Sequence, residues 1–479
     1  MGTGSDVGKS LIVAGLCRAL KNRNIKVAPF KPQNMSNNAS VCEGGGEIGR
    51  AQALQALAAG LEPDTNMNPI LLKPEHDSKA QLIIRGERIA SMSAKKYFSI
   101  REKYMPNVLG AFEELKQDYD YILVEGAGSA SEVNLRHNDL ANFGFAQSSN
   151  VPVILIGDIS RGGVIASIIG TLEVIDKKDK ELIVGSIINK FQGDKNLFAD
   201  GLKIIEKHTK QPTLGLVPFF PAANKLPAED VLVLEKRATN KPVGLFHIAI
   251  LKLSRIANFD DFDPLIAEEN IFVDMIEAGR SISQHADLII VPGSKATIAD
   301  MKFIIQQGWD IDIKAHVRAN KPVLGICGGY QILGKVISDP MGIEGEAQNI
   351  EGLGLLNIDT KLTEQKQLEN ITAIDAVFRQ KISAYHMHLG VSEGEDCKRP
   401  FALNNNENEG AISSDGLISG TYLHGIFAND GFRQNFLSHL GAKAEKSLNY
   451  QVQVEQVLDE LAAHLEANLD IDKILELAK

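Results

Sequence analysis

A glycine-rich loop at the start of the chain, running directly into an apolar helix, constrains the fold more than any other feature. Residues 2–10 read Gly-Thr-Gly-Ser-Asp-Val-Gly-Lys-Ser, and the helix-forming run Leu11–Leu20 follows them. Small residues let backbone N–H groups face phosphate oxygens, and the helix N-terminus adds positive potential. A plain turn before a helix is the alternative, but Gly-Lys-Ser and the helix occur together here. The residues predicted to bind a nucleotide in this loop are Thr3, Gly4, Ser5, Asp6, Gly8, Lys9 and Ser10.

Phosphate loops of this kind normally follow a central strand of a parallel sheet. Only Met1 precedes the loop in the printed sequence. We therefore expect the first strand to be missing from this sequence, either because the start is assigned too late or because the domain lacks that strand; a true loss would weaken nucleotide binding and the stability of the first domain.

Polar residues at the ends of later strands extend the predicted nucleotide site. The strand Tyr121–Val124 ends in Glu125 and a glycine-rich turn. A carboxylate there suits Mg²⁺, a hard cation that prefers oxygen ligands, so we predict Ser10 and Glu125 as metal ligands. An acid that caps the next turn is the structural alternative for Glu125. Asn189, after another apolar strand, is a candidate contact for the adenine base, and the predicted cofactors are ATP and Mg²⁺.

Composition narrows the functional classes. The chain has 479 residues and a formal net charge of −11, which disfavours nucleic-acid binding because that binding depends on Lys and Arg neutralising phosphates. Its four cysteines lack CxxC spacing, which argues against a zinc site and a disulfide framework. No apolar run reaches the roughly 20 residues needed to cross a bilayer. We expect a cytoplasmic protein with no membrane partner; its oligomeric state is left open.

The arrangement of short apolar strands predicts two parallel-sheet α/β domains. The first domain is predicted to be P-loop NTPase-like, with strands alternating with amphipathic stretches. A polar segment ending at Pro242 then reads as a linker, and a new series of strands follows. The predicted ranges are 1–238 for the first domain, 243–440 for the second, and 441–479 for a C-terminal helical extension that packs on the second domain.

The second domain carries a cysteine in a sharp turn. The apolar run Pro322–Ile326 leads into Gly-Ile-Cys-Gly-Gly and a helix, which is the pattern of a nucleophile elbow around Cys327. His424 is predicted as its proton-transfer partner, with His386 and His388 as the chief alternatives. Backbone N–H groups of Gly293 and Gly328 are predicted to stabilise an oxyanion. A buried structural cysteine is the alternative for Cys327.

Longer segments give the chain a specific resemblance. They include Lys31-Pro32-Gln33-Asn34-Met35-Ser36-Asn37-Asn38, Asp158-Ile159-Ser160-Arg161-Gly162-Gly163, Arg255-Ile256-Ala257-Asn258-Phe259-Asp260-Asp261-Phe262-Asp263-Pro264 and Ser419-Gly420-Thr421-Tyr422-Leu423-His424-Gly425. Over nearly its whole length the chain resembles the cobyric acid synthase family, the glutamine-dependent amidases of corrinoid (cobalamin) biosynthesis. The Asn-rich segment is far more specific than the phosphate loop or the elbow.

The resemblance implies a dethiobiotin-synthetase-like first domain and a class I glutamine amidotransferase-like second domain. It implies amidation of carboxylates b, d, e and g of adenosylcobyrinic a,c-diamide, with one ATP and one glutamine per amide. The small-molecule partners would be ATP, glutamine and a corrinoid. By the same resemblance, the substrate loop comprises Gln33, Asn34, Ser36 and Asn37, and Lys31, Arg50, Lys73 and Arg85 are candidates for contacting the anionic corrinoid.

Two departures from the expected patterns stand out. Ordinary class I amidotransferases place a glutamate two residues after the histidine, where this chain has Ile426, so His424 must be oriented by another group. Position 386 is histidine where the family pattern has glutamate. The rival interpretations are another carboxylate amidase, such as cobyrinic a,c-diamide synthase, and a nucleotide-dependent switch with an inactive second domain. The segment Asn34–Asn38 argues against the first of these.

Overall fold

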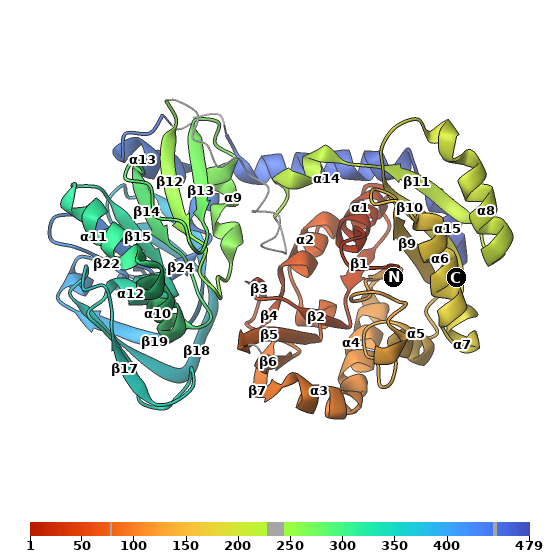
Figure 1. Ribbon diagram of the computed structural model, residues 1–479, viewed down its shortest axis with the longest axis horizontal. Helices are drawn as coiled ribbons and strands as arrows, with labels where there is room; N and C mark the ends of the chain where they lie inside the picture. The colour runs from red at the N-terminus through yellow and green to blue at the C-terminus, as the bar shows by residue number, and fades with distance from the viewer. Residues whose placement is uncertain (77–78, 228–243, 444–447) are drawn as a thin grey trace. The chain divides into compact units, whose positions relative to one another are not determined.

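The computed structural model describes residues 1–76, 79–227, 244–443 and 448–479. The chain forms two compact units, each built from segments distant in sequence (Figure 1). Unit 1 contains Met1–Ser36, Gly46–Pro227 and Val454–Lys479, and unit 2 contains Asn37–Gly45 and Ala228–Gln453. The predicted boundary near residue 240 lies outside the described residues.

Unit 1 contains parallel strands with helical crossovers, as predicted. Apolar residues run through each strand because both faces of the sheets are covered. β1 (Val27–Phe30) pairs in parallel with β8 (Tyr121–Val124), and β9 (Val153–Asp158), β10 (Ile183–Phe191) and β11 (Thr213–Pro218) form a second parallel sheet. The longer helices of this unit's first 227 residues are α1 (Lys9–Asn22), α2 (Arg50–Ala59), α4 (Met105–Asp118), α6 (Val164–Val174) and α8 (Ala199–Thr209).

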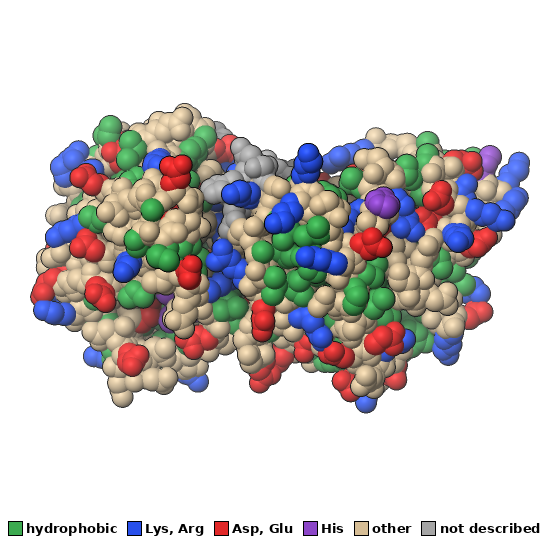
Figure 2. Space-filling view, turned by 90° about the horizontal axis from the view of Figure 1, so that it is seen from below, with side chains coloured by type: hydrophobic (Ala, Val, Ile, Leu, Met, Phe, Trp, Pro, Cys, Tyr) green, Lys and Arg blue, Asp and Glu red, His purple; other side chains and the backbone are tan. Residues whose placement is uncertain are grey.

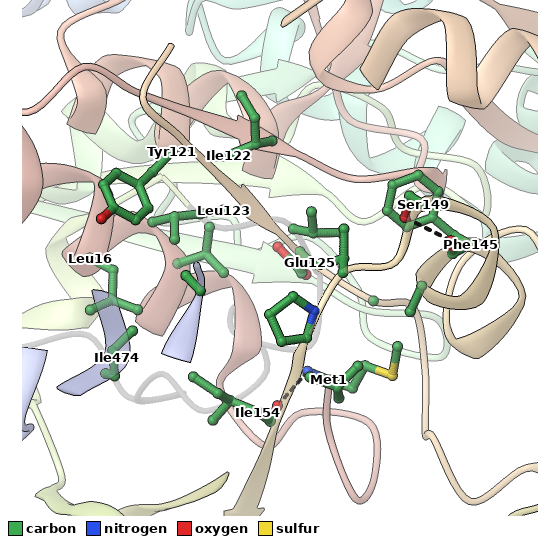
Figure 3. Close-up of a pocket in the computed structure, with 18 of the residues that line it drawn as sticks. Met1, Leu16, Tyr121, Ile122, Leu123, Glu125, Phe145, Ser149, Ile154 and Ile474 are labelled. Carbon is green, nitrogen blue, oxygen red and sulfur yellow. Dashed lines mark hydrogen bonds between the residues drawn. The ribbon is translucent and has the colours of Figure 1, made fainter. Parts of the chain in front are cut away.

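A cavity of about 660 Å³ separates β8 from β9 (Figure 3). It is lined on one side by Tyr121–Gly126 and on the other by Val151–Ile154. Residues 1–3 lie at its edge and pair with β9: the amino group of Met1 donates to Ile154 O at 2.8 Å, and Ile156 N donates to Met1 O at 2.8 Å. The short extended segment before the loop is thus hydrogen bonded to β9, while β8 belongs to a separate sheet.

A small mixed sheet, which the sequence patterns did not reveal, follows the first strand of unit 1. Its order is β2-β5-β6-β7. Its strands are β2 (Gln33–Met35), β5 (Ile70–His76), β6 (Lys79–Ile84) and β7 (Glu87–Ser93). This sheet positions the start of the Asn-rich segment, since Gln33, Asn34 and Met35 pair with Ile70, Leu71 and Leu72 of β5.

The C-terminal helices belong to unit 1, which corrects the expectation that they pack on the second domain. From Val454 onward, α14 (Tyr450–Glu466) and α15 (Ile471–Leu477) cluster with unit 1. A Cβ atom on Gly15 of α1 would lie 2.5 Å from Leu465 Cδ1, so that glycine permits close packing of α14. Arg18 also pairs with Glu455. The sequence pattern shows that one face of α14 is apolar, but it does not identify the surface that covers it.

Unit 2 is built on a mostly parallel sheet and an antiparallel sheet. The first has the order β13-β12-β14-β15-β23-β22, with β12 (Phe246–Leu251), β14 (Leu288–Val291) and β15 (Val323–Ile326) at its centre. The second contains the long hairpin of β18 (Ile358–Asp375) and β19 (Lys381–Gly394), which the sequence did not predict. The other strands of these sheets are β13 (Ile271–Ile276), β16 (Val336–Asp339), β17 (Gln348–Glu351), β20 (Ala402–Asn404), β21 (Glu407–Glu409), β22 (Ala411–Ile412), β23 (Ile418–Thr421) and β24 (Leu423–His424).

Four helices of six residues or more follow β14 within the described part of unit 2. They are α10 (Thr297–Gln307), α11 (Trp309–Arg318), α12 (Gly328–Leu333) and α13 (Asp430–His439). Among them, α12 packs on β14, β15 and β23. Basic and acidic side chains are intermixed over the face shown in Figure 2. Among the described residues, no helix is both long and apolar enough to cross a membrane.

Candidate functional sites

The glycine-rich loop precedes α1, as predicted, and its geometry depends on glycine at position 8. Gly8 has φ of +93° at the N-cap of α1, a conformation that favours glycine. A Cβ atom at this position would lie 2.3 Å from Asn189 Nδ2. Asn189 is buried and donates to Val7 O at 2.8 Å, so in this structure its amide holds the loop. Residues 3 to 10 and Asn189 are therefore brought together.

Lys9 begins the helix and lies against the loop backbone. Its Nζ donates to Gly4 O at 3.3 Å and to Gly128 O at 2.9 Å. Thr3 N donates to Ile156 O at 3.0 Å, while Ser5 and Asp6 are exposed. The ammonium group is thus fixed beside N–H groups that have no acceptor within the helix, an arrangement that suits a polyphosphate.

Ser10 and Glu125, the predicted metal ligands, lie within hydrogen-bond distance of each other. Ser10 Oγ donates to Glu125 Oε1 at 2.8 Å, Lys31 Nζ donates to the same oxygen at 2.9 Å, and Gln55 Nε2 donates to Oε2 at 2.6 Å. Burial raises the pKa of Glu125, but the Lys31 ammonium and these hydrogen bonds outweigh it and hold the pKa below its usual range. The carboxylate is therefore charged, and a hydroxyl with one charged carboxylate is a donor set that Mg²⁺ accepts beside phosphate oxygens.

The predicted substrate loop is largely buried where it leaves β2. Asn34 Nδ2 donates to Gln52 Oε1 at 2.9 Å, Tyr97 OH donates to Gln33 Oε1 at 2.5 Å, and Ser36 N donates to Leu72 O at 3.1 Å. Asn37, the fourth predicted residue, falls in unit 2. The loop therefore crosses from one unit to the other between Ser36 and Asn37.

The candidate basic contacts for an anionic substrate are mostly paired with carboxylates. Lys73 is fully buried and lies 2.6 Å from Glu47, while Lys31 lies 2.9 Å from Glu125. Arg85 pairs with Glu114 at the surface. These three basic side chains are thus balanced by neighbouring acids, a pairing between distant residues that no local pattern reveals.

The cysteine elbow of unit 2 has the geometry that the sequence predicted. Cys327 lies between β15 and α12 with φ of +52° and ψ of −110°, a strained conformation for a residue with a side chain. A Cβ atom on Gly329 would lie 1.9 Å from Val291 O, so only glycine fits there. Cys327 Sγ lies 3.7 Å from Met387 O.

His424 is the histidine that contacts the thiol. It is buried at the end of β24 and lies beside Cys327, since a Cβ atom on Gly293 would be 3.0 Å from His424 Cε1 and 3.7 Å from Cys327 Cβ. The two alternative histidines make other contacts: His386 Nδ1 is 3.6 Å from Glu369, and the His388 ring stacks on Tyr422 with centroids 3.7 Å apart.

Asp261 orients His424, and sequence reasoning missed it. Its Oδ2 is 2.7 Å from His424 Nδ1, and its Oδ1 accepts from Gly425 N at 2.7 Å. Burial lowers the pKa of His424, but the Asp261 carboxylate and the Cys327 thiol outweigh burial and raise the pKa to about 10. The imidazole is therefore protonated at neutral pH.

The predicted oxyanion groups flank the cysteine. Gly293 follows β14, and a Cβ atom there would lie 3.0 Å from His424 Cε1 and 3.7 Å from Cys327 Cβ. Gly328 is the first residue of α12, where N–H groups have no acceptor within the helix. A cysteine, a neighbouring histidine and backbone N–H donors in one site are the groups that acyl transfer from an amide requires.

Comparison with known proteins places the two units in described domain families. Residues 1–233 match the CobQ/CobB/MinD/ParA nucleotide binding domain, and residues 247–432 match the CobB/CobQ-like glutamine amidotransferase domain.

Full-length relatives are also similar across almost the entire chain. A protein named cobyric acid synthase from Bradyrhizobium diazoefficiens is 54% identical over 478 residues, covering 100% of this chain and 98% of that protein. Proteins of the same name from Rhodobacter capsulatus and from Jannaschia sp. (strain CCS1) are 52% and 51% identical, each with 98% of its own length covered.

Proposed function

This chain belongs to the cobyric acid synthase family, and we propose that it amidates the b, d, e and g carboxylates of adenosylcobyrinic acid a,c-diamide with ammonia from glutamine. One observation supports glutamine hydrolysis by unit 2: the side chains of Cys327, His424 and Asp261 lie side by side and are buried. A switch protein with an inactive second domain has no need of such an arrangement.

Glutamine hydrolysis begins at the thiolate of Cys327. The sulfur attacks the side-chain amide carbon of glutamine, and the carbonyl oxygen becomes an oxyanion that Gly293 and Gly328 N–H groups stabilise. The imidazolium of His424 gives its proton to the departing nitrogen, so ammonia leaves and a thioester remains. Neutral His424 then takes a proton from water, and the resulting hydroxide attacks the thioester to release glutamate and restore the thiolate. Asp261 holds the imidazole ring in position through both steps.

The substrate carboxylate is activated at the phosphate loop of unit 1. A carboxylate resists ammonia until one of its oxygens becomes a good leaving group, so transfer of the γ-phosphoryl group of ATP makes an acyl phosphate. Lys9 and the loop N–H groups bind the polyphosphate and neutralise charge during transfer. Ammonia then displaces phosphate and forms the amide.

Mg²⁺ is part of the proposal, with Ser10 and Glu125 as the protein groups that would hold it. When bound, the ion neutralises charge on the β- and γ-phosphates. Lys31 and Gln55 keep the Glu125 carboxylate in place and ionised.

A cytoplasmic location is a further element of the proposal. The four cysteines, all of which lie in described ranges, form no disulfide in this structure, which agrees with a reducing compartment.

Substitution of Cys327 tests whether unit 2 supplies the ammonia while unit 1 forms the amide. Cys327→Ala should abolish glutamate release and glutamine-dependent amidation, while amidation driven by ammonium chloride continues at the unaltered rate. Mass spectrometry of the corrinoid product should show four successive amide additions. Cys397→Ala, which removes a thiol elsewhere in unit 2, is the matched control. Loss of the ammonia-driven reaction in Cys327→Ala would contradict the proposal.

A further inference from the structure

Asn258 stands at the centre of the glutaminase site, although the chemistry described above does not use it. It is buried, has φ of +53°, and is the N-cap of the short helix η7 (Phe259–Phe262). Its backbone oxygen accepts from Asp261 N at 3.1 Å. The turn that presents the Asp261 carboxylate to His424 therefore starts at Asn258.

The backbone around Asn258 also reaches the cysteine side of the site. The preceding residue, Ala257, donates to Gly293 O at 3.0 Å. The side-chain Nδ2 of Asn258 lies 3.7 Å from the sulfur of Met387, whose carbonyl oxygen contacts Cys327. Asn258 and its neighbour Ala257 thus touch the segments that carry the Asp261 carboxylate, the Gly293 oxyanion donor and the Met387 wall behind the thiol.

The Oδ1 atom of Asn258 contacts Ala39, the residue that directly follows the Asn-rich segment. This oxygen accepts from Ala39 N at 3.3 Å, and both residues are buried in unit 2. Ala39 begins β3 (Ala39–Val41) within the segment Asn37–Gly45, which clusters with unit 2 although the residues on either side of it cluster with unit 1. Only Asn37 and Asn38 separate Ala39 from Ser36, the last substrate-loop residue of unit 1.

We propose that Asn258 is a positioning residue that makes glutamine hydrolysis depend on the state of the substrate loop. When Ala39 is hydrogen bonded to it, Asn258 fixes the start of η7, and Asp261 holds His424 against Cys327. When the loop pulls Ala39 away, the turn loses this support and hydrolysis slows, which limits release of ammonia in the absence of an acceptor. This inference rests on the proposed function and adds a coupling element to it.

Asn258→Gly removes the side-chain contacts and keeps a residue that tolerates positive φ. Glutamate release is measured with and without ATP, Mg²⁺ and adenosylcobyrinic acid a,c-diamide. We expect the turnover number for glutamine to fall about tenfold, which is about 1.4 kcal/mol at the transition state, with KM changed less than about twofold. Stimulation by the other substrates should be lost, while amidation driven by ammonium chloride is unchanged.

Asn258→Asp keeps an oxygen that accepts from Ala39 N, so its glutamate release should still be stimulated by the other substrates. This variant keeps the proposal testable if Asn258→Gly does not fold. Asn320→Gly, at another asparagine with positive φ in unit 2, is the matched control and should behave as the unaltered protein. The proposal is overturned if Asn258→Gly matches Asn320→Gly, if its defect lies in KM alone, or if Asn258→Asp loses stimulation completely. Glutamate release by Cys327→Ala at the unaltered rate would instead refute the proposed function itself.

Discussion

The phosphate-loop site and the thiol site differ in how the chain builds them. In unit 1, the predicted phosphate-binding residues are consecutive, and one helix start fixes most of their geometry. In unit 2, Asp261, Gly293, Cys327 and His424 come from four separate strand ends or turns. Contiguous sites can be recognised from local sequence, whereas a site assembled from distant segments is recognised only in part.

The largest effect should come from the lysine of the contiguous site. Lys9→Ala removes the charge beside the loop and should lower amidation about 10³-fold, with glutamine or with ammonium chloride as the nitrogen source. Lys21→Ala, at the end of the same helix, is the control and should change the rate less than about twofold. A defect confined to the glutamine-driven reaction would show that Lys9 does not serve carboxylate activation.

Asp261 tests whether the assembled site works as a unit. Asp261→Asn keeps the shape but no longer stabilises the imidazolium, so glutamate release should fall about 10²-fold with ammonia-driven amidation preserved. Steady-state kinetics for glutamine check this, with Asp260→Asn in the same turn as the control. Equal activity of the two variants would leave His424 oriented by some other group.

Gly293 tests how tightly that site is packed. Gly293→Ala places a Cβ atom 3.0 Å from His424 Cε1, closer than ordinary van der Waals contact. We expect a fall of about tenfold in the turnover number for glutamine, because the imidazole must shift relative to the thiol. Gly170→Ala, where nothing lies within 4 Å of the added atom, should leave this number unchanged.

A last prediction concerns stability in place of turnover: part of its pH dependence should come from the thiol site. His424 has a pKa raised from 6.5 to about 10, so between these values the folded state binds more protons than the unfolded state. The stabilising contribution is present below pH 6.5 and is lost as pH rises toward 10, with a slope of at most about 1.4 kcal/mol per pH unit. Urea unfolding at pH 7 and 9.5 should show a larger loss for the unaltered protein than for Asp261→Asn. Parallel losses in both proteins would assign the slope to other groups.

The contrast between local and long-range features also explains which parts of the fold could be predicted from the sequence. The strand Tyr121–Val124 could be predicted because a short apolar run next to turn residues is a local signal. The hairpin of β18 and β19 was missed because long stretches of it are half-exposed and polar, so they lack an apolar run.

Asp261 was missed for a related reason. The acidic run Asp260-Asp261-Phe262-Asp263 is visible in the sequence, but its contact with His424 spans 163 positions and no local period encodes it. One signal for such a residue was available in the sequence. Ile426 stands where other class I amidotransferases have a glutamate, so another group has to orient the His424 imidazole.

The division of the chain also bears on the order in which its parts complete their folds during synthesis. Residues 454–479 are translated after the whole of unit 2, yet they pack against α1 and hydrogen bond to β11, where Asp470 N meets Leu214 O. Unit 2 has all its residues once position 453 has emerged. The domain that is translated first is therefore the one that finishes last, and a nascent chain halted before its final helices would present a complete glutaminase beside an unfinished ATP-binding partner.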